Sequence, residues 1–239
     1  MKTVVAALVA TLSFSLSLRA QGGRVIMPAE IGVTTQRGKP FTATARTTLT
    51  ETLPDGTKKT RTVEDRIARD SKGRIYKEQH LPWTEDATNP IYYVNIYDPV
   101  GGRRIHIDPQ NHIFMISPVD RQRKNDYDPN EYLTLRARRV GESINNDKLG
   151  TQEIAGVKAM GRRVTHTYPA GMFGNPQPFV SVDEWWYSAE MGVDTARRRS
   201  DPRSGEQATE LLGLTRGEPD PGMFQPPPGY TRQTPPTRH

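Results

Sequence analysis

Turn-forming residues interrupt this sequence at short and regular intervals, and that spacing limits the folds open to the chain more than any other feature. Proline presets φ for a turn, and glycine supplies the positive φ that tight turns require. Strands separated by turn signals about every 8 to 12 residues are typical of an antiparallel sandwich or barrel. The clearest turns lie at Pro54-Asp55-Gly56, Asp70–Gly73, Pro99–Gly102, Pro109–Asn111 and Asp201–Gly205.

The segments between the turns have the periodicity of β-strands. Residues 41–53 alternate between two faces and are rich in threonine, which indicates a half-buried strand. Residues 91–98 are apolar on both faces, which favours a central, covered strand. Residues 131–140 fit a short helix or a strand equally well. The segments predicted as strands are 41–53, 57–69, 74–81, 91–98, 103–108, 112–117, 149–154, 160–168, 179–189, 193–200 and 206–216.

We therefore predict a single all-β domain over residues 41–230, mostly antiparallel and with little helix. A sheet of about ten to eleven strands is expected to curve into a half-barrel or an incomplete barrel. Glycine and proline break any period in residues 21–40, which we predict to be a poorly ordered lead-in. Residues 118–130 are charged and aperiodic, as in an exposed loop. Residues 231–239 are predicted to form a disordered tail.

The N-terminus has the pattern of a secretory signal peptide. Lys2 precedes an apolar run to Leu18, and Arg19 and Ala20 follow it. An uncleaved N-terminal anchor is the alternative. Cleavage near Ala20 would remove both basic residues, so the net charge falls from +6 to +4. We therefore expect a periplasmic or secreted protein. The sequence has no cysteine, so its stability must come from a packed core and not from disulfides.

Few residues in the sequence are spaced for catalysis or metal binding. His106 and Asp108 share a strand face, but a metal site needs three or four convergent ligands. Asp183 and Glu184 are adjacent in a strand and therefore point to opposite faces, which does not suit a glycosidase pair. No nucleophile elbow occurs in the sequence. We predict no enzyme activity, no metal and no cofactor.

The sequence also contains aromatic and basic residues that could form a nucleic-acid-binding surface. The tyrosines of residues 92–97, followed by Arg103 and Arg104, resemble a surface on which bases stack. Binding of nucleic acid usually concentrates positive charge on one face, whereas here acidic residues are interspersed. Because the chain also carries an export signal, we predict that it does not bind nucleic acid.

The remaining function is binding of an apolar ligand on the concave face of the curved sheet. In the alternative, the same residues fill an ordinary core. Trp185 and Trp186 must point to opposite faces. We predict that Trp185 points inward and that Trp186 lies on the convex side. Exposure of Trp186 there would indicate a contact with a partner. The predicted lining residues are Phe41, Leu49, Tyr93, Ile105, Phe114, Trp185 and Tyr187, with Val182 and Trp186 as further candidates.

Several motifs resemble those of a group of exported bacterial proteins. These are EWWYSAEMG at 184–192, DPRSGE at 201–206, EPDPGMFQPPPGY at 218–230, and the earlier RDSKGRIYKE and IYDPVGGRRIHIDP. More weakly, the layout resembles the LolA/LolB-like periplasmic lipoprotein carriers. That resemblance implies a curved antiparallel half-barrel whose concave face holds acyl chains, and it carries over no functional residue, because fold does not fix function.

The expected function is thus a periplasmic or secreted, non-enzymatic binding module for an apolar ligand such as a lipid or lipoprotein acyl chain. The alternative is a structural or protein-interaction module of the cell envelope, with an envelope protein as partner and a filled core. The two differ in whether the concave face encloses an apolar cavity of about 300 Å³ or more.

Overall fold

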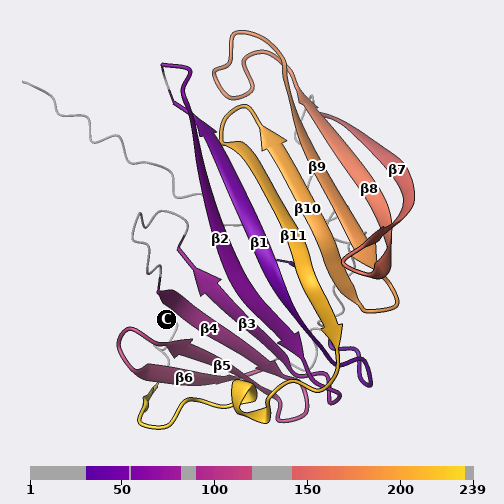
Figure 1. Cartoon of the computed structure of the whole chain (residues 1–239). Coiled ribbons are helices and arrows are strands. Elements are labelled where there is room, and N and C mark those ends of the chain that lie inside the picture. The colour runs from indigo at the N-terminus through magenta and orange to yellow at the C-terminus, as the bar shows by residue number, and fades with distance from the viewer. Residues whose placement is uncertain (1–30, 54, 82–89, 120–141, 235–239) are drawn as a thin grey trace, which may run out of the picture.

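The chain forms one open sheet that bends strongly across its width (Figure 1). In this computed structural model the described residues are 31–53, 55–81, 90–119 and 142–234. The strands are β1 (Phe41–Thr52), β2 (Lys58–Arg69), β3 (Ile75–His80), β4 (Ile91–Asp98), β5 (Arg103–Asp108), β6 (Ile113–Pro118), β7 (Ser143–Ile154), β8 (Val157–Tyr168), β9 (Phe179–Ser188), β10 (Val193–Asp201), β11 (Gly205–Arg216) and β12 (Thr231–Gln233). A single 3₁₀ turn, η1 (Pro221–Phe224), completes the described elements.

The strand order is β12-β6-β5-β4-β3-β2-β1-β11-β10-β9-β8-β7. The strands β1 to β6 form one meander and β7 to β11 another, and β1 pairs with β11 to join the two. All these pairings are antiparallel, and only β12 runs parallel to its neighbour β6. The predicted all-β, mostly antiparallel and incomplete barrel is confirmed, with twelve strands rather than ten or eleven.

Two structured segments lie outside the predicted domain, which was residues 41–230. Residues 231–233, at the start of the predicted tail, pair with β6 as β12. Residues 31–35, within the predicted lead-in, reach the hairpin between β9 and β10, where Val33 bridges Val193. Thr34 donates a backbone hydrogen bond of 2.8 Å to the Gly192 carbonyl oxygen. The predicted signal peptide, most of the charged stretch predicted at 118–130, and residues 131–140 lie outside the described residues.

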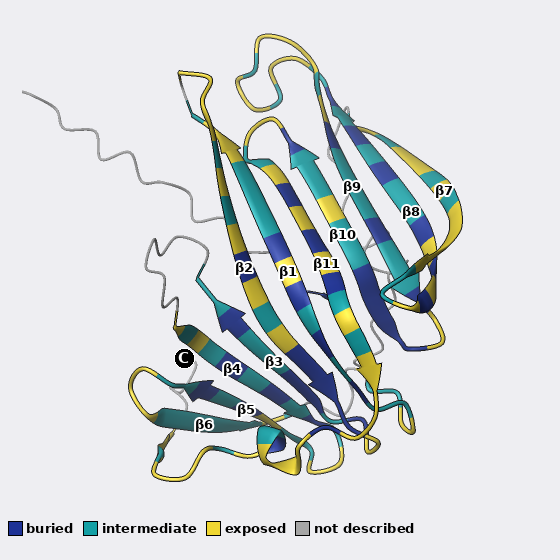
Figure 2. Ribbon diagram, in the orientation of Figure 1, coloured by how far each residue is buried: buried dark blue, intermediate teal, exposed yellow. Residues whose placement is uncertain are grey.

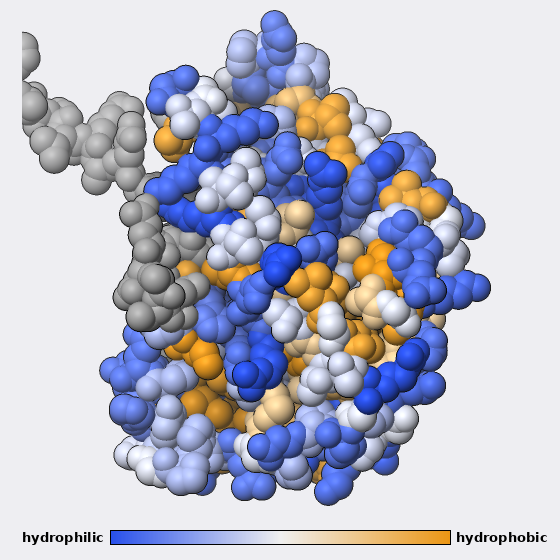
Figure 3. All heavy atoms as spheres, in the orientation of Figure 1, coloured by the Kyte–Doolittle hydropathy of each residue, from blue (hydrophilic) through white to orange (hydrophobic). Residues whose placement is uncertain are grey.

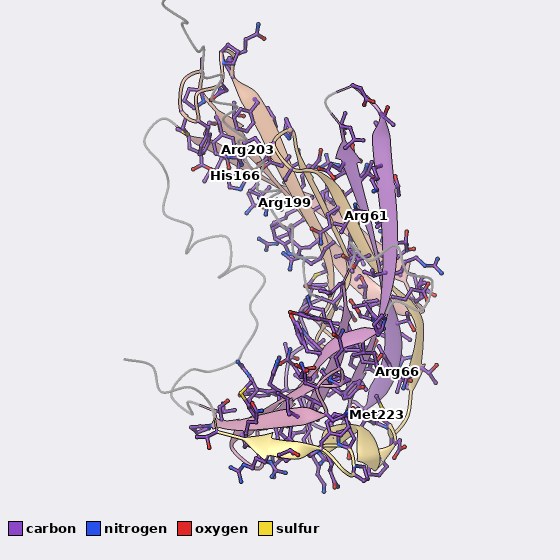
Figure 4. All side chains as sticks on the ribbon, turned by 90° about the vertical axis from the view of Figure 1, so that its left-hand side faces the viewer. Arg61, Arg66, His166, Arg199, Arg203 and Met223 are labelled. Atoms are coloured by element: carbon purple, nitrogen blue, oxygen red, sulfur yellow. The ribbon has the colours of Figure 1, made fainter. Side chains whose placement is uncertain are left out.

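The two faces of the sheet follow from the pairing register, because residues directly opposite in neighbouring strands share a face. Figure 4 shows the bend edge-on, with Arg199 on its hollow side and Arg66 on its outer side. Phe41, Ala43 and Ala45 belong to the hollow face, whereas Thr42 and Thr44 belong to the convex face.

Each face has its own hydrophobic core, and the two cores lie at different places (Figure 2). On the hollow face, Ile31 and Val33 pack over Phe41, Ile67 and Val193. On the convex face, the segment around η1 places Phe224, which is 1% exposed, on the strands β3 to β5. The Pro-rich end of the chain therefore serves as the cover of the second core.

On β1 and β2 the convex face is largely polar. Threonines and charged pairs such as Arg46 and Glu64, whose Nη2 and Oε1 atoms are 2.8 Å apart, follow β1 and β2. Figure 3 looks onto this face and shows hydrophobic residues as separate spots among hydrophilic ones. No helix among the described residues is long and apolar enough to cross a membrane.

Candidate functional site

The hollow face of the sheet is the candidate site, and it divides into three zones. The first is the apolar core beneath residues 31–40. The second is a mixed central zone that crosses β2, β1, β11, β10 and β9. The third is an aromatic cluster at the far ends of β8 and β9. Among the described residues outside the sheet, the segment 31–40 packs on the first zone, and Phe173 from the loop after β8 packs on the third.

The predicted lining residues do not all reach this face. Leu49, Tyr93, Trp185 and Tyr187 lie on the hollow face, where Trp185 is buried and the other three are partly exposed. Phe41 is also on this side, but it is completely buried in the core beneath residues 31–40.

Ile105 and Phe114 were predicted on the concave face and lie instead on the convex one. Ile105 is 0% exposed, and Phe114 packs against the same convex core as Phe224. Alternation within a strand shows which side chains share a face. It does not show which of the two faces is hollow, because that depends on segments that are distant in the sequence. Here the Pro-rich segment 218–230 covers the convex side of β3 to β6.

The tryptophan pair is arranged as alternation predicts. Trp185 lies on the hollow face opposite Arg197 and is 5% exposed. Trp186 and Val182 lie on the convex face, and the Trp186 ring rests on Gly161, where a Cβ would come within 2.5 Å of the ring. Glycine at 161 is therefore a packing requirement of Trp186, a link that the sequence alone did not reveal.

A cavity lies at the centre of the hollow face. Its volume is about 30 Å³, which is enough for about one water molecule and much too small for an acyl chain. Much of its lining is polar. The lining residues are Ile31, Ala45, Thr47, Asp65, Ile67, Lys77, Glu78, Gln79, Asn95 and Thr209.

Polar contacts hold the walls of this cavity in place. The Thr47 and Thr209 hydroxyl oxygens are 2.9 Å apart across β1 and β11. Lys77 Nζ donates a 2.7 Å hydrogen bond to the Ile31 carbonyl oxygen, which anchors the segment 31–40. His80 Nδ1 is 2.9 Å from Asp65 Oδ1. This hydrogen bond is the main reason that the pKa of His80 is raised.

Further along the same face, His106 has a different environment. Its Nδ1 atom is 3.0 Å from Asn95 Oδ1, and its ring centre is 5.1 Å from that of Tyr93. Burial lowers the pKa of His106, so the imidazole is predominantly neutral near pH 7. The carboxylate of Asp108 accepts hydrogen bonds from the backbone N–H groups of Gln110 and Asn111. His106 and Asp108, the two possible metal ligands, therefore each bind neighbouring residues.

An arginine surrounded by aromatic rings closes the far end of the face. The Arg203 Cζ atom lies 5.2 Å from the ring centre of Tyr168, 4.5 Å from that of Phe173 and 5.0 Å from that of Phe179. Asp201 accepts hydrogen bonds from Arg203 Nε and Nη2 at 2.9 and 2.6 Å. Burial opposes ionisation of Asp201, but these hydrogen bonds and the nearby arginine charges outweigh it and lower the pKa.

Beside this cluster, His166, Glu142 and Ser181 have the residue types of a catalytic triad. His166 Nδ1 is 2.6 Å from Glu142 Oε1. Ser181 is opposite His166 in the register, but it is 1% exposed and its hydroxyl makes no hydrogen bond. A serine nucleophile must lie within hydrogen-bond reach of its base and be accessible to substrate, so this trio lacks the contacts of a triad.

The other polar candidates are separated by the fold. Asp183 lies near Arg199 on the hollow face, whereas Glu184 accepts a 2.5 Å hydrogen bond from Arg163 on the convex face. Within the described part of the chain, no three histidine or acidic side chains gather in a way that could hold a metal ion.

Comparison with known proteins yields structural likenesses only. No protein-family model matches the sequence, and no curated protein matches it. An uncharacterized conserved protein from Thermus thermophilus is 8% identical, with 82% of this chain and 90% of that chain covered and a TM-score of 0.43. A chain of the MucA/MucB complex of Pseudomonas aeruginosa is 14% identical, with 80% of this chain covered and a TM-score of 0.42; this chain spans 56% of its length.

A LolA superfamily protein from Nitrosomonas europaea is also similar, at 11% identity, with 81% of this chain and 92% of that chain covered and a TM-score of 0.31. The layout of the sequence was expected to resemble LolA-like carriers weakly, and this match is too distant to decide that expectation. These likenesses are too distant to transfer a function, so the assignment below rests on the geometry of the hollow face.

Proposed function

We propose that this chain is an exported, non-enzymatic binding module of the cell envelope, and that its hollow face takes an apolar ligand such as a lipid or lipoprotein acyl chain. The observation that carries the proposal is the position of Leu49, Trp185 and Tyr187. They lie on one side of a bent open sheet, between two zones that are already packed.

The central cavity sets the form that such binding takes. At about 30 Å³ this cavity is too small for an acyl chain, so we place the ligand along the hollow face and not inside this cavity. Tyr93 and Tyr187, on opposite sides of the bend, are partly exposed and supply apolar contact area with polar ends. Ile105 and Phe114 are not part of this surface.

The test is ligand binding by the purified full chain. A native mass spectrum would reveal a co-purified lipid, and a fluorescent fatty acid would report binding through energy transfer from tryptophan. We expect Trp185→Leu to weaken probe binding about tenfold, because truncating a buried aromatic contact costs roughly 1 to 2 kcal/mol. Trp186→Leu is the matched control, since its neighbouring ring lies on the convex face.

Two results would contradict the proposal. One is a chain with neither co-purified lipid nor probe binding, which would favour the envelope interaction module with a filled core. The other is equal weakening by the two tryptophan substitutions, which would place the probe away from the hollow face.

A further inference from the structure

Three polar side chains form a row across the hollow face of the sheet. Arg61 on β2 is opposite Leu49 on β1, Leu49 is opposite Gln207 on β11, and Gln207 is opposite Arg199 on β10. Because directly opposed residues share a face, all four side chains project to the same side. Figure 4 shows Arg199 on the hollow side of the bend.

One donor atom of each of these three side chains is buried and has no hydrogen-bond acceptor among the described residues. Gln207 is 6% exposed, and its Nε2 atom has no partner. The Nε atoms of Arg61 and Arg199 are also buried and have no hydrogen-bond partner. A buried donor without a partner costs about 1 to 3 kcal/mol, and native proteins contain few of them. Three in one row indicate that an acceptor other than the described residues completes the site.

The charges around the row favour an anion as that acceptor. Arg61 makes no ion pair with any described residue. Arg199 Nε is 3.8 Å from Asp183 Oδ1, and Arg199 Nη2 is 3.7 Å from Asp201 Oδ2. Both distances are too long for a hydrogen bond. Asp201 already binds Arg203 at 2.6 Å. Two acids therefore lie near Arg199, but Asp201 is already bound to Arg203 and Asp183 is beyond hydrogen-bond distance.

The curvature of the sheet brings these donors toward one another. Neighbouring strands are about 4.8 Å apart, so Gln207 and Arg199 are adjacent and Arg61 is about 10 Å from Gln207 across Leu49. Side chains on a concave face converge, and guanidinium groups match the planar or tetrahedral oxygens of carboxylates and phosphates. Leu49 within the row provides an apolar contact next to the charged donors.

We propose that Arg61, Gln207 and Arg199 bind the anionic group of the ligand, a carboxylate or a phosphate. For the apolar part of that ligand the inference rests on the function proposed above. The ligand is then an amphiphile: its charged end lies against this row and its chain runs along the hollow face past Trp185.

The experiment measures affinity for matched pairs of ligands. A long-chain fatty acid is compared with the alcohol of the same chain length, and lysophosphatidic acid with the corresponding monoacylglycerol. Inorganic phosphate is tested alone. We expect the charged member of at least one pair to bind about tenfold to a hundredfold more tightly, as charge-assisted hydrogen bonds contribute. The pair with the larger ratio identifies the anion as carboxylate or phosphate.

The variants separate this role from a purely structural one. Arg61→Gln combined with Arg199→Gln is expected to abolish the preference for the charged ligand while leaving affinity for the neutral one unchanged. Arg198→Gln removes the same charge from the same strand on the opposite face, where the side chain is 63% exposed, and should keep the preference. Gln207→Leu removes a buried donor that has no partner, so it should raise the melting temperature. Because the donor would no longer bind the anion, the variant should also show a smaller preference for the charged ligand over the neutral one.

Each outcome decides between the two proposals. Equal affinity for charged and neutral ligands overturns the anion row and leaves the apolar binding function standing. Binding of inorganic phosphate that is lost in the double variant, without binding of any lipid, supports the row and overturns the lipid function. Absence of all binding overturns both.

Discussion

Arg69, the last residue of β2, donates a 2.6 Å hydrogen bond from Nη2 to the carbonyl oxygen of Met191, 122 residues further along the chain. The same guanidinium donates to the carbonyl oxygens of Thr34 and Lys39. It is 0% exposed, and these three acceptors are neutral carbonyl groups. Burial lowers the pKa of Arg69 to about 10, so the group stays charged at neutral pH. One side chain therefore ties the segment 31–40 to both meanders.

The first prediction concerns this buried arginine. We expect Arg69→Met to lower the free energy of unfolding by about 3 kcal/mol or more, because it leaves three buried or partly buried carbonyl oxygens without these donors. Urea unfolding followed by tryptophan fluorescence measures the change. Arg66→Met is the matched control on the same strand, since Arg66 is 60% exposed and should cost no more than about 0.5 kcal/mol. Equal losses in the two variants would show that Arg69 is not a tie between the segments.

The second prediction concerns the paired hydroxyls beside the central cavity. Thr47→Val leaves the buried Thr209 hydroxyl without its partner at 2.9 Å, and we expect a loss of about 1 to 2 kcal/mol. Replacing both threonines by valine removes both hydroxyls while keeping their shape, so the double variant should regain most of that loss. A double-mutant cycle of unfolding free energies checks this. Simple additivity of the two single losses would contradict the pairing.

The third prediction follows from the raised pKa of His80. A raised pKa in the folded state means that the folded chain holds the proton more tightly than the unfolded chain. The stabilisation is fully present below the unfolded value of about 6.5 and is lost as the pH rises through the folded pKa. We expect the difference in unfolding free energy between the parent and His80→Gln to be larger at pH 5 than at pH 8.

For His106 the pKa shift, and therefore the expected change of stability with pH, has the opposite sign. Its pKa is lowered by burial, so its protonation favours the unfolded state as the pH falls below about 6.5. His106→Gln should therefore gain stability relative to the parent at acid pH, whereas His80→Gln should lose it. Unfolding curves at matched pH values distinguish the two, and the same pH trend in both variants would contradict these assignments.

The fourth prediction concerns the tryptophan on the convex face. Gly161→Ala places a Cβ within 2.5 Å of the Trp186 ring, so the ring must shift and stability should fall by about 1 to 3 kcal/mol. Trp186→Leu removes the ring, and the same alanine should then cost much less. Unfolding free energies of the parent, the two single variants and the double variant measure this coupling. A full loss in the Trp186→Leu background would show that the glycine serves another purpose.

The sequence by itself was sufficient for the strand pattern. The hairpins from 179 to 216 match β9, β10 and β11 to within one residue at each end, because turn residues and alternation are local properties. Alternation also separated Trp185 from Trp186 correctly. The strand β7 was predicted only from residue 149, whereas it begins at Ser143, because its first half, SINNDK, is polar and shows little apolar alternation.

Tertiary structure alone decided which face is hollow and what covers the other. Ile105 and Phe114 were assigned to the wrong side because the cover of their face comes from residues 218–230, more than a hundred positions away. The same holds for the row of Arg61, Gln207 and Arg199, which three strands bring together through pairing register. Local pattern determines how side chains alternate along one strand, whereas long-range pairing and curvature determine which of them meet.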